Sequence, residues 1–421
     1  MSSSRNIILR IDWISIVVFL CLVVIGWANI YSAKYTEEAA LTFFESTHGK
    51  QFSFIVLSFA LIIFLFSLEA KFYERFASVF YLLAIALLLG LFVFGKTRSG
   101  ETSWYNFGAI GLQPSEFAKS ATAIAIAKFL SDISTNLRQR FIDQIKAFTI
   151  IFVPVLIILI QSDEGSALVY LSLIFVLYRE GLPSIYFNAV ISFALIFILT
   201  IAFGIVWVSI GIFIFLLFLF IKKSLKLKRF RKAIYLGLLA VMIGFSFFSN
   251  YFFDKVLQPH QQDRINLVLG KEVTTAGRDY NTNQSLIAIG SGGLFGKGWL
   301  SGTQTKGDFV PEQHTDYIFS TIGEEWGFIG SFSVIFLYAF LIIRILFIAE
   351  RQKNSFSRIY GYGVASILFT HFAINIGMVI GLVPTIGIPL PFVSYGGSSL
   401  WGFTVLLFVF LKLDANRINE W

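Results

Sequence analysis

The sequence has few cysteines, few histidines and few charged residues. A single cysteine, Cys21, excludes an intramolecular disulfide framework. Four histidines cannot supply a dense His/Cys set, so a structural zinc site is not expected. Charged residues make up only 14% of the 421 residues, far less than in a soluble chain of this length. These shortages argue against a disulfide-rich scaffold, a zinc protein and a soluble globular enzyme.

Apolar residues take the place of the missing charge. They form 56% of the chain, phenylalanine alone accounts for 49 residues, and the mean hydropathy is +0.76. A membrane-spanning helix needs about 20 mostly apolar residues. The sequence therefore predicts an all-α, polytopic membrane helix bundle of about twelve spans. The expected spans are 12–33, 51–69, 74–95, 114–131, 145–161, 165–180, 184–203, 204–221, 233–252, 316–348, 358–382 and 399–415.

Lysine and arginine are concentrated in alternate connections, which predicts that both termini are cytoplasmic. No cleavable signal peptide is expected, because the first apolar run is long enough to span. The densest basic run, 222–232, is interpreted either as an anionic-lipid patch or as a topology determinant. Three polar segments then face outward, 96–113, 253–315 and 383–398, and the middle one is the longest. A large extracytoplasmic loop of this kind is usually functional or disordered, and its interleaved aromatic residues favour function.

The large loop contains a glycine-rich stretch at 289–298 that invites comparison with a phosphate-binding P-loop. The spacing excludes that motif, because Ser291 stands where glycine is needed and Gly298 where serine or threonine is needed. Two interpretations remain. The glycine backbone and Lys297 could approach an anion, or the stretch could form a tight re-entrant turn packed on the bundle.

Asp316 ends the large loop and opens an apolar helix. It could simply cap the helix N-terminus, where a carboxylate satisfies free N–H groups. However, Glu312 and His314 lie close by in sequence, and Glu324 and Glu325 follow about two turns further along the helix. Ionisable groups at membrane depth are costly and often mark functional sites. Asp316 is therefore a candidate for both roles, and helix position lowers its pKa whereas burial raises it.

Charged residues also occur within the expected spans. Glu116 and Lys119 are three residues apart on one helix, where they either neutralise each other or contact a substrate. Asp163 lies between the fifth and sixth spans, either in an interfacial turn or on a substrate path. A divalent cation, magnesium or manganese, bound by carboxylates and substrate phosphates is left open as a cofactor.

Several motifs together resemble the SEDS (shape, elongation, division, sporulation) family of peptidoglycan glycosyltransferases. They follow one another from the fourth span to the last, in family order, and several together are highly specific. Lys297 and Gly302-Thr303-Gln304 are more similar to the elongation branch than to the division branch. The matching stretches are Gln113-Pro114-Ser115-Glu116, Asn283-Gln284-Ser285, the run 289–298, Gly302-Thr303-Gln304, Pro311 to Asp316, Gly323-Glu324-Glu325 and Pro389 to Ser398.

This resemblance implies an enzyme of the bacterial plasma membrane that polymerises lipid II into glycan strands at the outer face. It would maintain rod shape during elongation, together with a class B penicillin-binding protein. Asp316 matches the essential aspartate of the family and is the candidate catalytic base. Charge on the leaving diphosphate would be met by Lys297, Arg264, Arg278, Lys119 or a divalent cation. The candidate substrate-binding residues are Glu116, Lys119, Asp163, Lys297, Gln304, Glu312, His314, Trp104, Arg264 and Ser394.

The chain departs from the family pattern in three places. Ser103 precedes Trp104 where the family usually has arginine, which could move a basic contact to Arg98. The turn at 161–163 reads Gln-Ser-Asp where Gln-Pro-Asp is usual. Family members mostly have ten spans, so the surplus pair is expected within 184–252, inside a single SEDS-like membrane domain that covers 1–421.

Two other classes of function compete with a polymerase. A lipid II flippase or secondary transporter would use the charges within the spans, Glu116, Lys119 and Asp163, to line a translocation path. A non-enzymatic membrane scaffold for the penicillin-binding protein would need none of these residues for chemistry. The absence of an inverted repeat with paired broken helices argues against the transporter.

Overall fold

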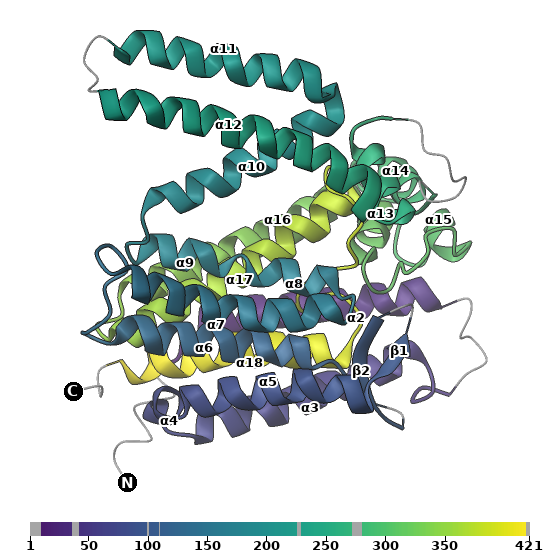
Figure 1. The fold of residues 1–421 in the computed structure, drawn as a ribbon. Coiled ribbons are helices and arrows are strands. Elements are labelled where there is room, and N and C mark those ends of the chain that lie inside the picture. Colours follow the sequence, from purple (N-terminus) through teal and green to yellow (C-terminus); the bar gives the residue numbers. More distant parts are fainter. Residues whose placement is uncertain are drawn as a thin grey trace. The chain divides into compact units, whose positions relative to one another are not determined.

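The computed structural model describes residues 10–35, 42–98, 101–108, 110–224, 229–271 and 280–417. The chain forms two compact units (Figure 1). The first unit contains residues 1–182 and 280–421, and the second contains residues 183–279. Each unit is described by itself.

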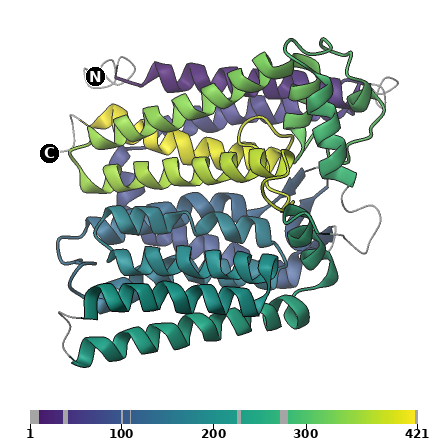
Figure 2. The same cartoon turned by 90° about the horizontal axis from the view of Figure 1, so that it is seen from above.

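The first unit is a bundle of long helices whose axes run nearly parallel (Figures 1 and 2). Side chains cap several of them: Asp12 accepts from the Ser15 backbone at 3.1 Å, and Asn354 accepts from the Phe356 backbone at 2.8 Å. The long helices are α2 (Trp13–Lys34), α3 (Thr47–Ser67), α5 (Ala77–Phe94), α6 (Pro114–Ser131), α7 (Phe141–Ile160), α16 (Ile318–Glu350), α17 (Ser355–Val379) and α18 (Gly397–Asn416).

Shorter elements connect the long helices of this unit. They are α4 (Ala70–Arg75), α8 (Glu164–Tyr170), α9 (Leu173–Arg179), α14 (Tyr280–Ser291) and α15 (Thr303–Lys306). The outward segment 96–113 is not a plain loop. It forms a small antiparallel sheet of β1 (Lys96–Arg98), β2 (Glu101–Phe107) and β3 (Ile110–Leu112), in that order. The aromatic residues of β2 favour strand over helix, a local signal that the all-helical prediction passed over.

The second unit consists of three long helices followed by short ones. These are α10 (Ser184–Phe203), α11 (Ile205–Ser224), α12 (Arg229–Tyr251), the π-helical turn η1 (Phe252–Val256) and α13 (Pro259–Val268). Gly204 adopts φ 84° between α10 and α11, a conformation that favours glycine and ends the helix. Ile196, Val208, Ile212 and Leu216 form a buried cluster among the long helices.

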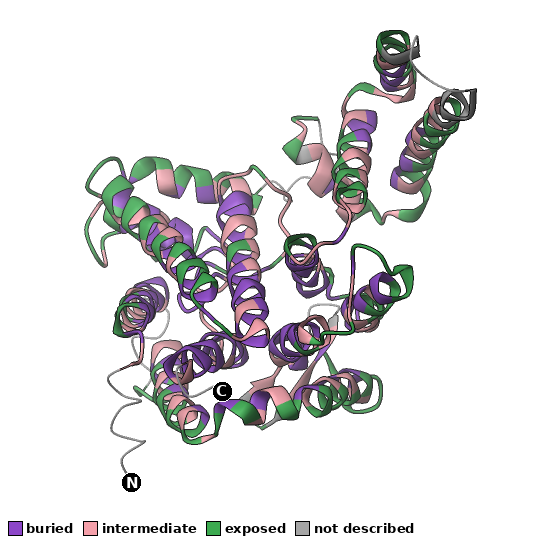
Figure 3. Cartoon of the chain, turned by 90° about the vertical axis from the view of Figure 1, so that its left-hand side faces the viewer, coloured by how far each residue is buried: buried purple, intermediate pink, exposed green. Residues whose placement is uncertain are grey.

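Ten helices of the described residues are long and apolar enough to cross a membrane. The prediction of a polytopic membrane helix bundle is therefore confirmed, whereas length and composition support ten of the twelve expected spans. The two others fall on α6, which carries Glu116 and Lys119, and on 165–180, which folds as the short helices α8 and α9. Within the first unit the buried residues face inward and the outer faces are exposed (Figure 3).

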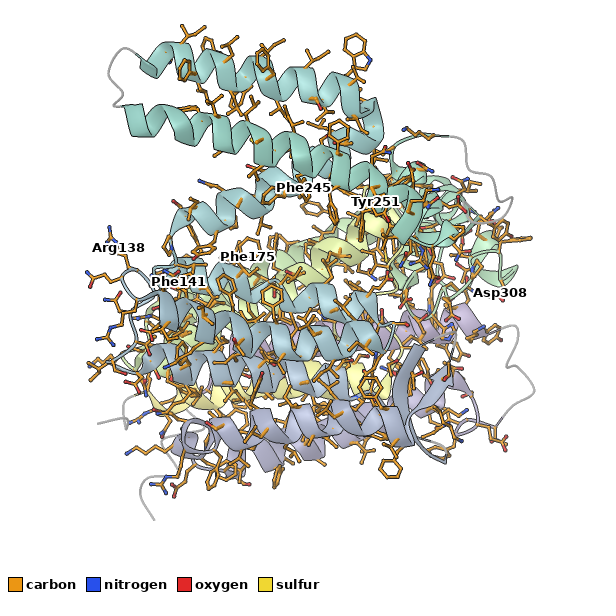
Figure 4. The ribbon with its side chains drawn as sticks, in the orientation of Figure 1. Arg138, Phe141, Phe175, Phe245, Tyr251 and Asp308 are labelled. Carbon is orange, nitrogen blue, oxygen red and sulfur yellow. The ribbon has the colours of Figure 1, made fainter. Side chains whose placement is uncertain are left out.

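The first unit has two chemically different ends. Arg138, from a segment predicted to be cytoplasmic, and Asp308, from the predicted extracytoplasmic loop, lie at opposite ends of the helices (Figure 4). The small sheet and α15 lie at the Asp308 end (Figures 1 and 2). Helix α6 starts from the sheet and ends before Arg138, so it runs the length of the bundle.

Candidate functional site

Asp316 lies between two loops that are hydrogen-bonded to each other at the Asp308 end. The Ser394 hydroxyl donates to the Thr315 carbonyl at 2.6 Å, and the Tyr395 backbone donates to the His314 carbonyl at 2.9 Å. Asn375 on α17 donates to the Asp316 carbonyl at 2.8 Å. The segments 311–317 and 385–395, far apart in sequence, therefore form one structure around the Asp316 carboxyl.

The capping explanation for Asp316 is wrong. The N-cap of α16 is Tyr317 and not Asp316, and the helix has no capping hydrogen bond from its N-cap side chain. Asp316 keeps part of its surface accessible but is densely surrounded by protein. Burial, followed by the charge of the exposed Glu312, raises the pKa of the Asp316 carboxyl to about 7. Burial thus outweighs the helix N-terminus, and the carboxyl can hold or release a proton near neutral pH.

The glycine-rich stretch is a turn packed on a kink in α16. Gly327 interrupts the helix with φ 64° and ψ −156°. The backbone of Lys297 and that of Gly298 donate to the carbonyls of Glu324 and Glu325, both at 3.0 Å, and Phe328 donates back to Gly293 at 2.9 Å. These contacts fit the interpretation as a packed re-entrant turn, because the N–H groups of Lys297 and Gly298 bind protein carbonyls.

Close packing at this kink excludes side chains. A Cβ added at Gly327 would lie 2.3 Å from the backbone nitrogen of Gly296, and one added at Gly296 would lie 2.1 Å from the Glu325 carbonyl oxygen. Real Cβ atoms do not approach so closely. The glycines are therefore required for the approach of two backbones.

Glu324 is a fully buried carboxylate that organises the Gly302–Gln304 motif. It accepts from the Gln304 and Thr305 backbones, both at 2.9 Å, and from Lys297 Nζ at 2.7 Å. Lys297 is thus already held by a protein carboxylate and would have to leave it to reach a substrate diphosphate. Gln304 contributes its backbone here, while its Oε1 is buried without a hydrogen-bond partner.

Glu116 and Lys119 form a buried network with a residue that the sequence did not single out. Lys119 Nζ lies 2.8 Å from Glu116 Oε1 and 2.8 Å from His371 Nε2. His371 Nδ1 lies 3.2 Å from the Pro389 carbonyl. His371 and Asn375 are polar residues one turn apart in an apolar helix, and that spacing was the available signal.

The other predicted residues lie elsewhere in the first unit. Asp163 caps α8 by accepting from the Ser166 backbone at 2.9 Å, and it also accepts from Gln113 Nε2 at 2.9 Å. Trp104 lies on β2, opposite Lys96, and its ring faces Gly111. Glu116, Lys119 and Asp163, which motivated the transporter alternative, are therefore all bound to neighbouring protein groups.

Arg264 belongs to α13 of the second unit, and Arg278 lies outside the described residues. Among the residues that the structure describes, no three His, Cys, Asp or Glu side chains come together as metal ligands. The structure thus gathers Glu312, His314, Asp316 and Ser394 in one place. It places Lys297 with Gln304, and Glu116 with Lys119, in two further clusters.

Comparison with known proteins shows the family to which this chain belongs. The chain matches the FtsW/RodA/SpoVE family, described as cell cycle protein, over residues 12–209 and 208–419. It is 35% identical over 349 residues to the peptidoglycan glycosyltransferase MrdB of Escherichia coli K12, covering 82% of this chain and 80% of the relative. It is 32% identical over 435 residues to the peptidoglycan glycosyltransferase RodA of Treponema pallidum, covering 97% and 98%. A probable peptidoglycan glycosyltransferase FtsW of Enterococcus hirae is 30% identical over 420 residues, covering 98% and 94%.

Solved structures share the fold. A chain from a peptidoglycan synthase complex superposes with a TM-score of 0.69 at 23% identity, covering 98% of this chain and all of that chain. The rod shape determining protein RodA of Thermus thermophilus superposes with a TM-score of 0.62 at 24% identity, covering 97% and 98%. At these identities the likeness concerns the fold alone.

Proposed function

The chain belongs to the FtsW/RodA/SpoVE (SEDS) family, and from this premise we propose that it polymerises lipid II into glycan strands with Asp316 as catalytic base. It is a peptidoglycan glycosyltransferase, homologous to the RodA and MrdB enzymes of rod shape. The observation that carries the proposal is Asp316 itself: the residue is partly accessible, and burial raises the pKa of its carboxyl to about 7.

The reaction joins two sugars in one displacement. The 4-hydroxyl oxygen of an acceptor GlcNAc forms a bond to the anomeric carbon of a MurNAc carried on a lipid diphosphate. The bond from that carbon to the diphosphate oxygen breaks with inversion, and Asp316 accepts the proton of the attacking hydroxyl. An alcohol is a poor nucleophile, and a base with a pKa near the working pH is the efficient choice.

The departing lipid diphosphate needs positive charge nearby. Lys297 and Lys119 are the described candidates, but each would have to leave Glu324 or Glu116 to supply it. Arg264 and Arg278 stay predictions from the sequence. Glu312 and Asp316 are the carboxylates that would hold a divalent cation, and the cation would supply positive charge to the departing diphosphate. Dialysis against EDTA, followed by titration with magnesium or manganese, tests this requirement.

The base is tested by Asp316→Asn in purified protein given lipid II. General-base catalysis contributes about 10²- to 10⁴-fold, and we expect a loss of polymerisation of that size. The amide preserves shape, so the thermal unfolding midpoint verifies folding. Glycan synthesis at the parental rate in a folded variant would rule out Asp316 as the base.

We also propose the finer features of the membrane arrangement. Helix α6 and the pair α8–α9 would cross the bilayer in addition to the ten apolar helices. This gives twelve spans, a ten-span core plus a pair within 184–252, in one membrane domain across 1–421. Both termini would be cytoplasmic in the bacterial plasma membrane, with 253–315 and Asp316 outside.

A class B penicillin-binding protein is the proposed partner. The support is the fold shared with a chain of a peptidoglycan synthase complex. Co-purification of the full chain with such a transpeptidase from its own cell envelope, and the polymerisation rate with and without it, test the partnership. A partner that neither binds nor changes the rate would overturn it.

A further inference from the structure

Two polar side chains one turn apart on α17 are sealed from solvent. His371 and Asn375 are 1% and 0% exposed. The proposed chemistry uses neither of them. Buried polar groups are costly unless they are hydrogen-bonded, so the partners of the His371 ring and of the Asn375 Nδ2 group indicate what they do.

His371 connects the Glu116–Lys119 pair to the loop beside Asp316. An ammonium group can only donate, so Nε2 of His371 accepts from Lys119 across 2.8 Å. The ring proton then resides on Nδ1 and is donated to the Pro389 carbonyl across 3.2 Å. Phe403 packs edge-on against the ring, with centroids 4.7 Å apart and planes at 90°. The ring is therefore fixed in both tautomer and orientation.

Asn375 binds both the same loop and the backbone of Asp316. Its Nδ2 donates to the Ile388 carbonyl at 2.7 Å and to the Asp316 carbonyl at 2.8 Å. Gly387, just before Ile388, adopts φ 75°, and a Cβ added there would lie 3.3 Å from Asp316 Oδ2. Helix α17 thus holds three backbone carbonyls: those of Ile388, Pro389 and Asp316.

We propose that His371, acting with Asn375, is a positioning residue that fixes the segment 387–389 against the Asp316 carboxyl and couples this segment to the buried Glu116–Lys119 pair. The proposal rests on the role of Asp316 in the proposed function. A displacement of about 1 Å at a reacting group can cost about 10²-fold in rate, so anchoring of this kind has a measurable effect.

Stability alone does not require this network. Buried ion pairs replaced by well-packed apolar residues are often equally stable or more so. The network reaches from Glu116 on α6 through Lys119 and His371 to the Pro389 carbonyl, at the loop that contacts Asp316. A contribution to catalytic geometry explains why a network that is costly to bury is present and why it leads to the loop beside Asp316.

Two conservative variants separate the two bonds of His371. In His371→Asn the side-chain amide can reach the Nδ1 position and donate to Pro389, but nothing reaches Lys119. In His371→Gln the amide oxygen can reach the Nε2 position and accept from Lys119, but the Pro389 carbonyl loses its donor. Asn375→Leu removes both of its bonds. Ser357→Ala, a buried polar position near the start of α17, is the matched control.

The full chain in detergent, with lipid II as substrate, provides kinetic readouts. We expect His371→Gln and Asn375→Leu to lower kcat about 10- to 100-fold, with KM changed less than about twofold. His371→Asn should retain more of kcat than His371→Gln, and Ser357→Ala should match the parent. Hydrogen–deuterium exchange of residues 384–396 should be faster in His371→Gln and Asn375→Leu, but not in Ser357→Ala.

The outcomes of these measurements test positioning by His371 separately from catalysis by Asp316. Unchanged exchange of residues 384–396 in folded His371→Gln, or faster exchange with an unchanged kcat, would overturn positioning by His371. Full activity of Asp316→Asn would instead refute the catalytic base, whatever the exchange result. Loss of kcat in His371→Gln, with loosened 384–396 and an inactive Asp316→Asn, supports both.

Discussion

Asp316 differs from an ordinary surface aspartate through its surroundings. Its backbone carbonyl is bound by Asn375, and Gly387 leaves open the space beside its carboxyl. Burial makes the ionised form costly, and the Glu312 charge adds to that cost. The result is a carboxyl whose proton affinity is adjusted to neutral pH, as a base that must repeatedly accept and release a proton requires.

The raised pKa predicts the pH dependence of the enzyme. A base must be ionised, so kcat/KM should fall about tenfold per pH unit below about 7, the pKa of Asp316. Glu312→Gln removes a negative charge and should move this acidic limb to lower pH, by less than about 1 unit because burial is the larger cause. Rates of glycan synthesis between pH 5 and pH 9 measure the acidic limb of the parent and that of Glu312→Gln. A limb that stays in place in Glu312→Gln would show that Glu312 does not act on the base.

The same shift has a consequence for folding. The folded pKa of about 7 lies above the usual 3.8, so the folded state binds this proton more tightly than the unfolded state. Stabilisation by protonation is complete below about pH 3.8 and is lost as pH rises through about 7. Asp316→Asn should therefore raise the thermal midpoint relative to the parent at pH 8 more than at pH 5. The thermal midpoints at the two pH values therefore show whether Asp316→Asn loses activity while it stays folded.

At the scale of elements, α16 is the organising helix of the site. Its first part carries Glu324 and Glu325, and Gly327 redirects it before the long apolar part. The glycine-rich turn inserts its backbone at this kink, and Glu324 holds the start of α15 from within the helix. The conformations of α16, the glycine-rich turn and the start of α15 therefore depend on contacts with one another rather than on local propensity.

The Lys297–Glu324 pair provides a direct test of this dependence. Glu324 is fully buried, so Lys297→Met should leave an uncompensated charge and destabilise the protein by about 3–5 kcal/mol. Glu324→Gln alone weakens several hydrogen bonds as well as the ion pair. In the double variant Lys297→Met with Glu324→Gln, part of the loss should be recovered, and a double-mutant cycle of unfolding free energies measures the coupling. Strict additivity would contradict the pairing.

Gly327→Ala tests the kink. The added Cβ clashes with the Gly296 backbone at a φ of 64°, so a loss of more than about 1 kcal/mol is expected. Gly211 on α11 is the matched control, because nothing lies within 4 Å of a Cβ added there. Gly211→Ala should be neutral or stabilising by up to about 1 kcal/mol. Equal thermal midpoints for the two variants would argue against a required kink.

At the scale of the whole molecule, the two ends of the first unit are held together by different contacts. Asp12 pairs with Arg344 at 2.5 Å, and Arg351 pairs with Asp414 at 2.5 Å, joining distant helices at the end away from Asp316. Each pair links an arginine of α16 or its C-cap to the N-cap of α2 or to α18. The end that carries Asp316 is held by loop hydrogen bonds together with the Lys297–Glu324 ion pair.

The proposed orientation can be measured in a cysteine-free background. Cys21 is the single native cysteine, so Cys21→Ser supplies that background. Arg138→Cys and Asp308→Cys then place one thiol at each end of the bundle (Figure 4). A membrane-impermeant maleimide applied to spheroplasts should label the Asp308→Cys variant and spare the Arg138→Cys variant until the membrane is opened. The reverse labelling would invert the proposed topology.

The sequence by itself determined the class of the protein, the approximate position of its helices and the prominence of Asp316. Apolar runs of spanning length and charge asymmetry are local signals, and motifs in family order carry the enzyme class. Only the tertiary structure decided the roles of individual polar residues. The sheet at 96–112, the partners of Lys297 and Lys119, and the place of His371 all depend on contacts between distant segments. The pKa of Asp316 was likewise undecided in the sequence, because its burial arises only when the chain folds.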